Sequence, residues 1–272
     1  MNRLRTVFCV APLLAAVGAA FAQSQPATGG EERELIVFAA ASLREAFEKM
    51  SEAFKREHPG IKVTFNFAGS QELRVQIESG AAVDVFASAD RRNLNALKAG
   101  RWVEAERIFA RNEPVLAVPS DGGAAIFSFE DLPKAKRIVV AAPEVPIGGY
   151  TVQILERAYR RYGDQFRKQV EGRIVSNELN VRQVLAKVRL GEADAGFVYR
   201  TDVASVGTGV RAIRIPEDLN VTAEYPVAMV TAARHRKLAA AWIDLMTSPE
   251  GQMTLGRHGF LSGRPGDARR TP

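Results

Sequence analysis

The most constraining feature of this 272-residue sequence is a regular alternation of short apolar segments with amphipathic ones. Residues 35–39 form a continuous apolar run, which is typical of strands buried on both faces. Residues 43–54 then place apolar side chains at helical spacing, and residues 61–67 alternate as a half-buried strand does. The same succession of strand and helix follows in residues 84–99. This pattern predicts an α/β fold whose mostly parallel sheets carry helices on their faces.

A second series of strands and helices begins near residue 114. Residues 114–119 form an apolar strand between two prolines, which favours a sheet edge or a crossing between lobes. After a predicted loop at residues 121–133, residues 137–142 and 194–199 supply further apolar strands. Residues 225–230 form a similar proline-containing strand, which is expected to return the chain from the second lobe to the first. We therefore expect two lobes joined by a two-strand hinge.

Both ends of the chain are expected to lie outside the lobes. The first 22 residues have the basic, apolar and small-residue regions of a secretory signal peptide, which predicts export to the periplasm after cleavage behind Ala22. The only cysteine, Cys9, lies within this signal, so we expect no disulfide in the mature chain. The expected organisation is a signal peptide (1–22), a disordered linker (23–32), lobe 1 (33–113 and 227–262), lobe 2 (114–226) and a disordered tail (263–272).

The charge balance argues against nucleic acid as a partner. The formal net charge is +6, and it falls to +4 when the two arginines of the signal peptide, Arg3 and Arg5, are removed. The sequence contains no block of five or six basic residues and no interleaved aromatic stripe that could grip a nucleic acid backbone.

Two corners between a strand and a helix in lobe 1 carry a serine. Ser42 follows the first apolar strand, and Glu45 three residues later completes the spacing of a capping box. Ser70 follows Gly69 at the end of the second strand and is expected to cap the next helix. The free N–H groups and the dipole of a helix start both favour an anion, although such a serine alone is more often a simple cap.

Two further corners fall in lobe 2. Ile147 lies between a proline and two glycines, where its backbone N–H is expected to be available, although such clusters are more often plain turns. Asn180 is a predicted N-cap that leaves the N–H of Val181 in the first helical turn. Tyr199 ends a predicted strand, where a tyrosine is more often a core residue. Since ligands of open α/β sheets bind beyond the carboxyl ends of the strands, four such corners predict an anion held between the lobes.

Signatures of enzymes are absent from the sequence. It has no G-x-x-x-x-G-K-[ST], H-E-x-x-H or G-x-S-x-G motif, and its three histidines are too scattered to indicate a metal site. Residues 207–212 match G-x-G-x-x-A, but they follow no apolar strand, and we interpret them as a turn. Asp84 and Asp90 have no neighbouring base or nucleophile and are expected to cap helices or to be solvated. We expect a binding protein, without a cofactor.

Several sequence blocks resemble the periplasmic molybdate-binding proteins of molybdate ABC transporters, in unbroken order from about residue 35 to residue 260. The blocks are FAAASL (38–43), FAGS (67–70), QIESGA (76–81), DVFASAD (84–90), GFVY (196–199) and YPVA (225–228). The resemblance implies a two-lobed type II periplasmic binding protein that acts as a monomer and delivers molybdate to a membrane permease and its ATPase. It also implies no bound metal cation, since molybdenum arrives as an oxyanion.

The resemblance further implies which residues hold the anion. Two serine hydroxyls, two backbone amides and a tyrosine hydroxyl of the family fall on Ser42, Ser70, Ile147, Val181 and Tyr199. The isoleucine is a departure, because the family often has a small alanine there, and a bulkier wall could alter the cavity. The sequence does not separate molybdate from tungstate. A different oxyanion such as sulfate, or a sensor or enzyme built on the same scaffold, remains an alternative.

Overall fold

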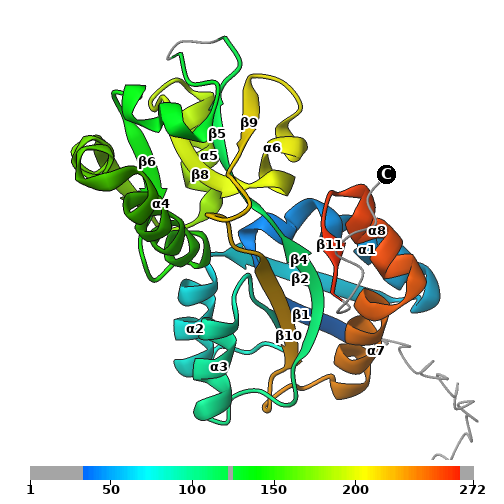
Figure 1. The fold of residues 1–272 in the computed structure, drawn as a ribbon. Coiled ribbons are helices and arrows are strands. Elements are labelled where there is room, and N and C mark those ends of the chain that lie inside the picture. Colours follow the sequence, from blue (N-terminus) through cyan, green and yellow to red (C-terminus); the bar gives the residue numbers. More distant parts are fainter. Residues whose placement is uncertain (1–32, 122–124, 264–272) are drawn as a thin grey trace, which may run out of the picture. The chain divides into compact units, whose positions relative to one another are not determined.

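The computed structural model describes residues 33–121 and 125–263, and Figure 1 shows their fold. The predicted signal peptide, the expected linker and the expected tail beyond residue 263 lie outside the described residues. The described chain folds around two sheets that belong to one compact unit. We refer to each sheet with its helices as a lobe.

The first lobe is built on a six-stranded sheet. Its strands are β1 (Arg33–Ala40), β2 (Ile61–Ala68), β3 (Val85–Ala87), β4 (Arg107–Asn112), β10 (Ala223–Met229) and β11 (Leu261–Ser262). They lie in the order β11-β4-β10-β3-β1-β2. β1 is parallel to β2 and β3, as the alternation predicts, whereas β10 is antiparallel to β3 and β4.

Both faces of this sheet are covered by helices (Figure 1). These are η1 (Ala41–Leu43), α1 (Arg44–Glu57), α2 (Ser70–Glu78), α3 (Arg91–Ala99), α7 (Arg236–Thr247) and α8 (Pro249–Arg257). Val37 and Phe38 are neighbours in β1 and point to opposite faces, as successive strand residues do. Val37 packs in a core cluster with Phe47 of α1 and Trp242 of α7, whereas Phe38 packs in another with Leu73 of α2. This two-sided burial explains why β1 is continuously apolar.

The second lobe is built on a five-stranded sheet of order β7-β6-β8-β5-β9. Its strands are β5 (Pro114–Pro119), β6 (Ile138–Ala141), β7 (Ile174–Glu178), β8 (Ala195–Tyr199) and β9 (Val210–Arg214). Its helices are η2 (Phe129–Lys134), α4 (Pro146–Glu171), α5 (Val181–Arg189) and α6 (Arg200–Val206). β6 is parallel to β7 and β8, while β5 is antiparallel to β8 and β9.

Three local expectations need correction. Residues 129–134 form the short helix η2, so the predicted loop at 121–133 ends earlier than expected. Only the start of the G-x-G-x-x-A segment is a turn, with φ of 66° at Gly207 and 91° at Gly209, and Val210 already begins β9. β10 belongs to the first sheet from Ala223 onward, so the chain returns to lobe 1 before the expected boundary at residue 226.

Candidate functional site

A small cavity of about 20 Å³ lies where strands of both sheets end. This volume exceeds what one water molecule needs. The described residues that line it are all uncharged: Ala40, Ala41, Ser42, Ala68, Gly69, Ser70, Ala89, Val145, Pro146, Ile147, Asn180, Val181 and Tyr199. The structure therefore brings all five residues singled out in the sequence to one cavity, as the convergence of corners predicts.

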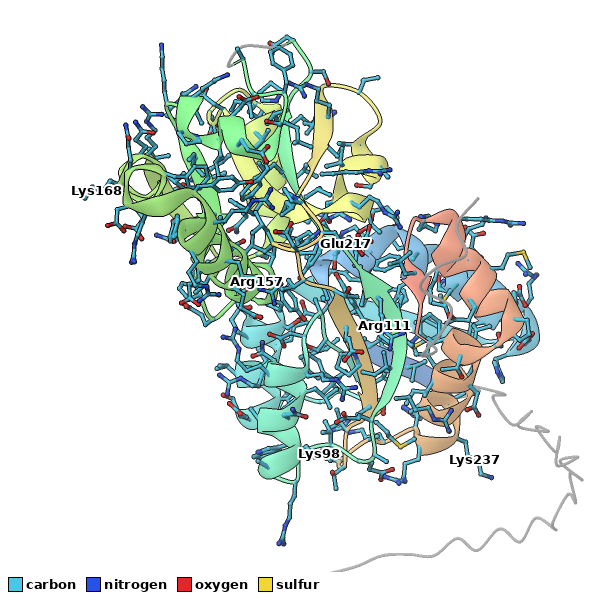
Figure 2. All side chains as sticks on the ribbon, viewed as in Figure 1. Lys98, Arg111, Arg157, Lys168, Glu217 and Lys237 are labelled. Atoms are coloured by element: carbon cyan, nitrogen blue, oxygen red, sulfur yellow. The ribbon has the colours of Figure 1, made fainter. Side chains whose placement is uncertain are left out.

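No lysine or arginine is among the described residues that line the cavity. Figure 2 shows Lys98, Lys168 and Lys237 pointing outward from α3, α4 and α7, and all three are exposed.

Among the described residues, no helix has the length and apolar character needed to cross a membrane. Within the same part of the chain, no three His, Cys, Asp or Glu side chains gather where they could hold a cation.

Tyr199 presents a hydroxyl that has no partner within the described structure. The side chain is 1% exposed, and its oxygen is buried without a hydrogen bond. Burial raises the pKa of this phenol well above its ordinary value, so the group remains a neutral donor. A buried hydroxyl without a partner is costly, which is why it indicates a place for an acceptor inside the cavity.

Ser70 and Ser42 do not act as the helix caps that their spacing predicts. Gly69 occupies the N-cap of α2, and its N–H is bound by the side chain of Glu72 at 2.9 Å. The Ser70 hydroxyl instead accepts the N–H of Ala89 at 3.1 Å. Ser42 lies inside η1 and contacts the hydroxyl of Tyr225 at 3.0 Å. The capping-box prediction for Ser42 and Glu45 is therefore wrong, because a tertiary partner takes the hydroxyl.

The second lobe offers backbone N–H groups at two helix starts. Asn180 is an N-cap as predicted, and its Oδ1 accepts the N–H groups of Arg182 and Gln183, leaving that of Val181 in the first turn. Ile147 follows Pro146 at the start of α4. A Cβ on Gly148 would lie only 1.9 Å from the carbonyl oxygen of Ala142, so the glycine allows this helix to begin directly against the end of β6.

The two aspartates considered in the sequence have structural partners. Asp90 caps α3 by accepting the N–H of Asn93 at 2.9 Å, as expected. Asp84 is buried and accepts the N–H groups of Ile36 and His235, both at 3.0 Å. The expectation that it is solvated is wrong, since it ties β1 to the segment that leads into α7.

Hydrogen bonds made by side chains close to the cavity-lining residues join the two lobes. Nε2 of Gln71 donates to the carbonyl of Leu179 at 2.7 Å, and an Arg92 nitrogen donates to the carbonyl of Glu144 at 2.6 Å. The Tyr150 hydroxyl donates to the carbonyl of Ala89 at 3.3 Å. No local pattern in the sequence indicates these residues, because their partners lie 50 or more positions away.

An arginine next to the cavity also bridges the lobes. Arg182 follows Val181 in α5 and pairs with Glu45 of α1 at 2.5 Å and with Asp202 of α6 at 3.2 Å. Asp202 is fully buried and accepts the N–H of Tyr199 at 2.9 Å. Burial raises the pKa of Asp202 to about 6, although Arg182 and the Tyr199 N–H act against this rise. The adjacency of Arg182 to Val181 was the one available signal for it.

A model of the family described as bacterial extracellular solute-binding proteins matches residues 35–261. The chain belongs to this family. The molybdate-binding protein ModA of Mycobacterium tuberculosis (strain H37Rv) is 38% identical over 230 residues, which cover 84% of each protein. These relatives are solute-binding proteins, in agreement with the expectation of a binding protein and not an enzyme. The family description as extracellular agrees with the expected export.

Two solved structures share the fold of this chain. The periplasmic molybdate-binding protein of Azotobacter vinelandii matches with a TM-score of 0.72 at 19% identity, covering 84% of this chain and 98% of that one. The sulfate-binding protein SubI of Mycobacterium tuberculosis matches with a TM-score of 0.75 at 15% identity, covering 86% and 88%. The predicted two-lobed type II periplasmic binding protein fold is thus confirmed.

Proposed function

We propose that this protein captures molybdate, and also tungstate, in the cavity between its lobes and delivers it to the permease of an ABC importer. The observation that carries this proposal is the buried, unpartnered Tyr199 hydroxyl in an uncharged cavity. The 38% identity to a protein named for molybdate binding supports the choice of anion. The hydroxyls of Ser42, Ser70 and Tyr199 and the N–H groups of Ile147 and Val181 hold the anion in this proposal.

Uncharged donors suffice for a dianion. Hydrogen bonds to an ionised acceptor are about twice as strong as bonds between neutral groups. The starts of α2, α4 and α5 add free N–H groups and favourable helix dipoles. Sulfate is also a tetrahedral dianion and can accept the same hydrogen bonds, so it must be rejected chiefly by its smaller size.

The remaining parts of the proposal concern processing and partners. The signal peptide is cleaved after Ala22, and the mature protein acts as a monomer in the periplasm. It presents the bound anion to a membrane permease that is driven by an ATPase. The two lobes, each built on one of the two sheets, close on the anion.

A competition titration tests the proposed ligand. The mature chain from Gln23 onward is titrated calorimetrically with molybdate, and the complex is then challenged with tungstate, sulfate or phosphate. We expect one molybdate per chain, full displacement by tungstate, and weak displacement by sulfate and phosphate. No heat with molybdate, together with strong heat with sulfate or phosphate, would assign the site to another oxyanion.

Serine substitutions test the proposed contacts. We expect Ser42→Ala and Ser70→Ala each to weaken molybdate binding by about 1–3 kcal/mol, because each removes a hydrogen bond to a charged group. Dissociation constants from the same titration measure the effect. Ser79→Ala is the matched control, since this serine lies exposed at the far end of α2. Unchanged affinity in both cavity variants would remove the two serines from the site.

A further inference from the structure

A buried chain of polar side chains runs from the cavity to the segment that joins the sheets. Ser42 Oγ lies 3.0 Å from the Tyr225 hydroxyl, which lies 3.4 Å from Nδ2 of Asn112. The same Nδ2 lies 2.8 Å from Oγ1 of Thr201. All four side chains are buried, and Tyr225 and Asn112 are fully so. These hydrogen bonds connect η1, β10, β4 and α6 at the point where the polypeptide passes between the lobes.

The hydrogen bonds among these four side chains have an assignable direction. Oδ1 of Asn112 accepts the N–H of Glu113 at 2.9 Å, which turns the amide nitrogen toward Tyr225 and Thr201. An amide nitrogen only donates, so the Tyr225 oxygen accepts from Asn112. The single phenol proton of Tyr225 is then left for Ser42. Burial raises the pKa of this phenol well above its ordinary value, so the proton is retained.

Ser42 therefore accepts a hydrogen bond from Tyr225 and keeps its own proton for another acceptor. Ser70 is oriented in the same way, because its oxygen accepts the N–H of Ala89 and its own proton remains available for an acceptor. Both hydroxyls line the cavity. A ligand oxygen that carried a proton and donated it to Ser42 would leave the serine proton without an acceptor, which is unfavourable in a buried site.

We propose that Tyr225, oriented by Asn112, is a positioning and specificity-determining residue that holds Ser42 as a donor toward the anion and so disfavours protonated oxyanions. The inference rests on the proposed function and adds a selection by protonation to the selection by size. Sulfate and hydrogen phosphate provide the probe, because both are small tetrahedral dianions near neutral pH and only the latter carries a proton. Tyr225 does not touch the cavity in this assignment and acts through Ser42.

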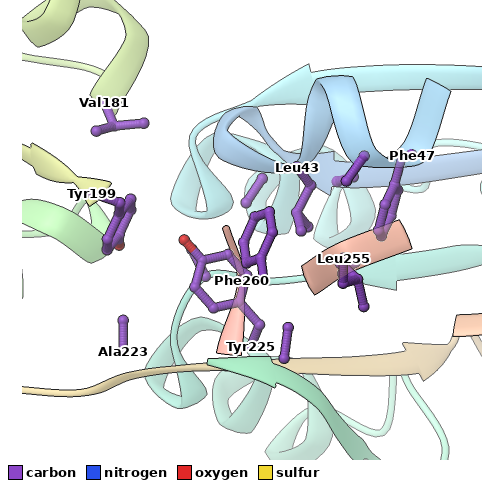
Figure 3. Packing of buried hydrophobic residues seen from close by; sticks show 14 of the residues in the cluster. Leu43, Phe47, Val181, Tyr199, Ala223, Tyr225, Leu255 and Phe260 are labelled. Carbon is purple, nitrogen blue, oxygen red and sulfur yellow. The ribbon is translucent and has the colours of Figure 1, made fainter. Parts of the chain in front are cut away.

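Tyr225 also packs as a core ring, which the test must separate from its hydrogen bonding. Its ring lies 5.5 Å from that of Phe260 and 5.8 Å from that of Tyr199, centroid to centroid, and Figure 3 shows these rings beside one another. Tyr225→Phe keeps the ring and removes only the hydroxyl. Tyr162→Phe is the matched control, since its hydroxyl binds Glu130 on the surface of lobe 2.

The experiment measures the affinity of each variant for molybdate and, by displacement at pH 8, for sulfate and phosphate. We expect Tyr225→Phe to raise the dissociation constant for molybdate by about tenfold and to lower the preference for sulfate over phosphate by a similar factor. If phosphate displaces nothing from the wild type, its displacement of molybdate in the variant supports the inference, and continued failure counts against it. Thr201→Val keeps the Asn112–Tyr225–Ser42 segment and should leave the preference unchanged.

Two results would overturn the inference while leaving the proposed function intact. One is a Tyr225→Phe protein that binds molybdate as the wild type does, with the same preference. The other is an equal loss of affinity for all three anions, which would show that Tyr225 serves packing alone. Failure of the wild type to bind molybdate would instead refute the proposed function.

Discussion

Gly69→Ala should weaken molybdate binding by about 1–3 kcal/mol, roughly 5- to 150-fold in the dissociation constant, while the protein remains folded. A Cβ at this position would lie 2.5 Å from the carbonyl oxygen of Leu179, which belongs to the other lobe, and equally close to the side-chain amide of Gln71, which can move away. That carbonyl also accepts the hydrogen bond from Gln71. The backbone at Gly69, with φ of −63° and ψ of 139°, suits alanine without strain. The added methyl group therefore opposes closure of the lobes and not the folding of lobe 1.

Two measurements separate closure from folding in this variant. Thermal unfolding without ligand should match the wild type, whereas calorimetry with molybdate should show the loss. Gly256→Ala is the matched control, because a Cβ at that position in α8 meets no atom within 4 Å. Wild-type affinity in Gly69→Ala would mean that the anion is bound without the approach of Leu179 seen here.

Arg182→Met should lower the free energy of unfolding at pH 7 by about 3–5 kcal/mol, since it leaves a buried carboxylate without its counter-charge. Asp202 is 0% exposed, and its carboxylate lies against Arg182 and accepts the N–H of Tyr199. Burial already raises the pKa of Asp202 to about 6 with Arg182 in place. Removal of the arginine raises this pKa further. The deficit should therefore shrink as the pH falls from 7 to 5, because the carboxyl group can then bind a proton.

Urea unfolding of the ligand-free protein at both pH values measures this effect. Glu45→Gln is the control, since it removes the partly exposed partner of Arg182 and should cost less than about 1 kcal/mol. An Arg182→Met protein as stable as the wild type at pH 7 would show that Asp202 does not need the arginine. Because Asp202 also fixes the backbone of Tyr199, we expect the same variant to bind molybdate more weakly.

The fold was largely predictable because its central strands are buried on both faces. Residues 35–39 and 138–141 are continuously apolar, and the helices that follow them carry clear apolar stripes. β4 and β7 were not recognised, since RIFARN and IVSNE mix charged or polar residues with apolar ones. Their place in a sheet depends on neighbours that are distant in sequence, which a local pattern does not contain.

The convergence of the candidate residues on one cavity was predictable from the sequence, but their hydrogen bonds were not. The positions of Ser42 and Ser70 at strand ends brought both to the cavity, as the topology requires. Their hydroxyls bind Tyr225 and Ala89, which lie 183 and 19 residues away. Local spacing favoured capping for both serines, and tertiary contacts outweighed it.

The contacts that join the two lobes close to the cavity also bear on how fast the proposed anion is released. For the proposed anion to leave by separation of the lobes, Gln71 must part from Leu179 and Arg92 from Glu144, and the contacts of Tyr150 and Arg182 across the lobes must break as well. Its residence time should then depend on how often these contacts break together, in addition to the strength of its own hydrogen bonds. Substitutions that weaken the contacts between the lobes should therefore speed release of the anion.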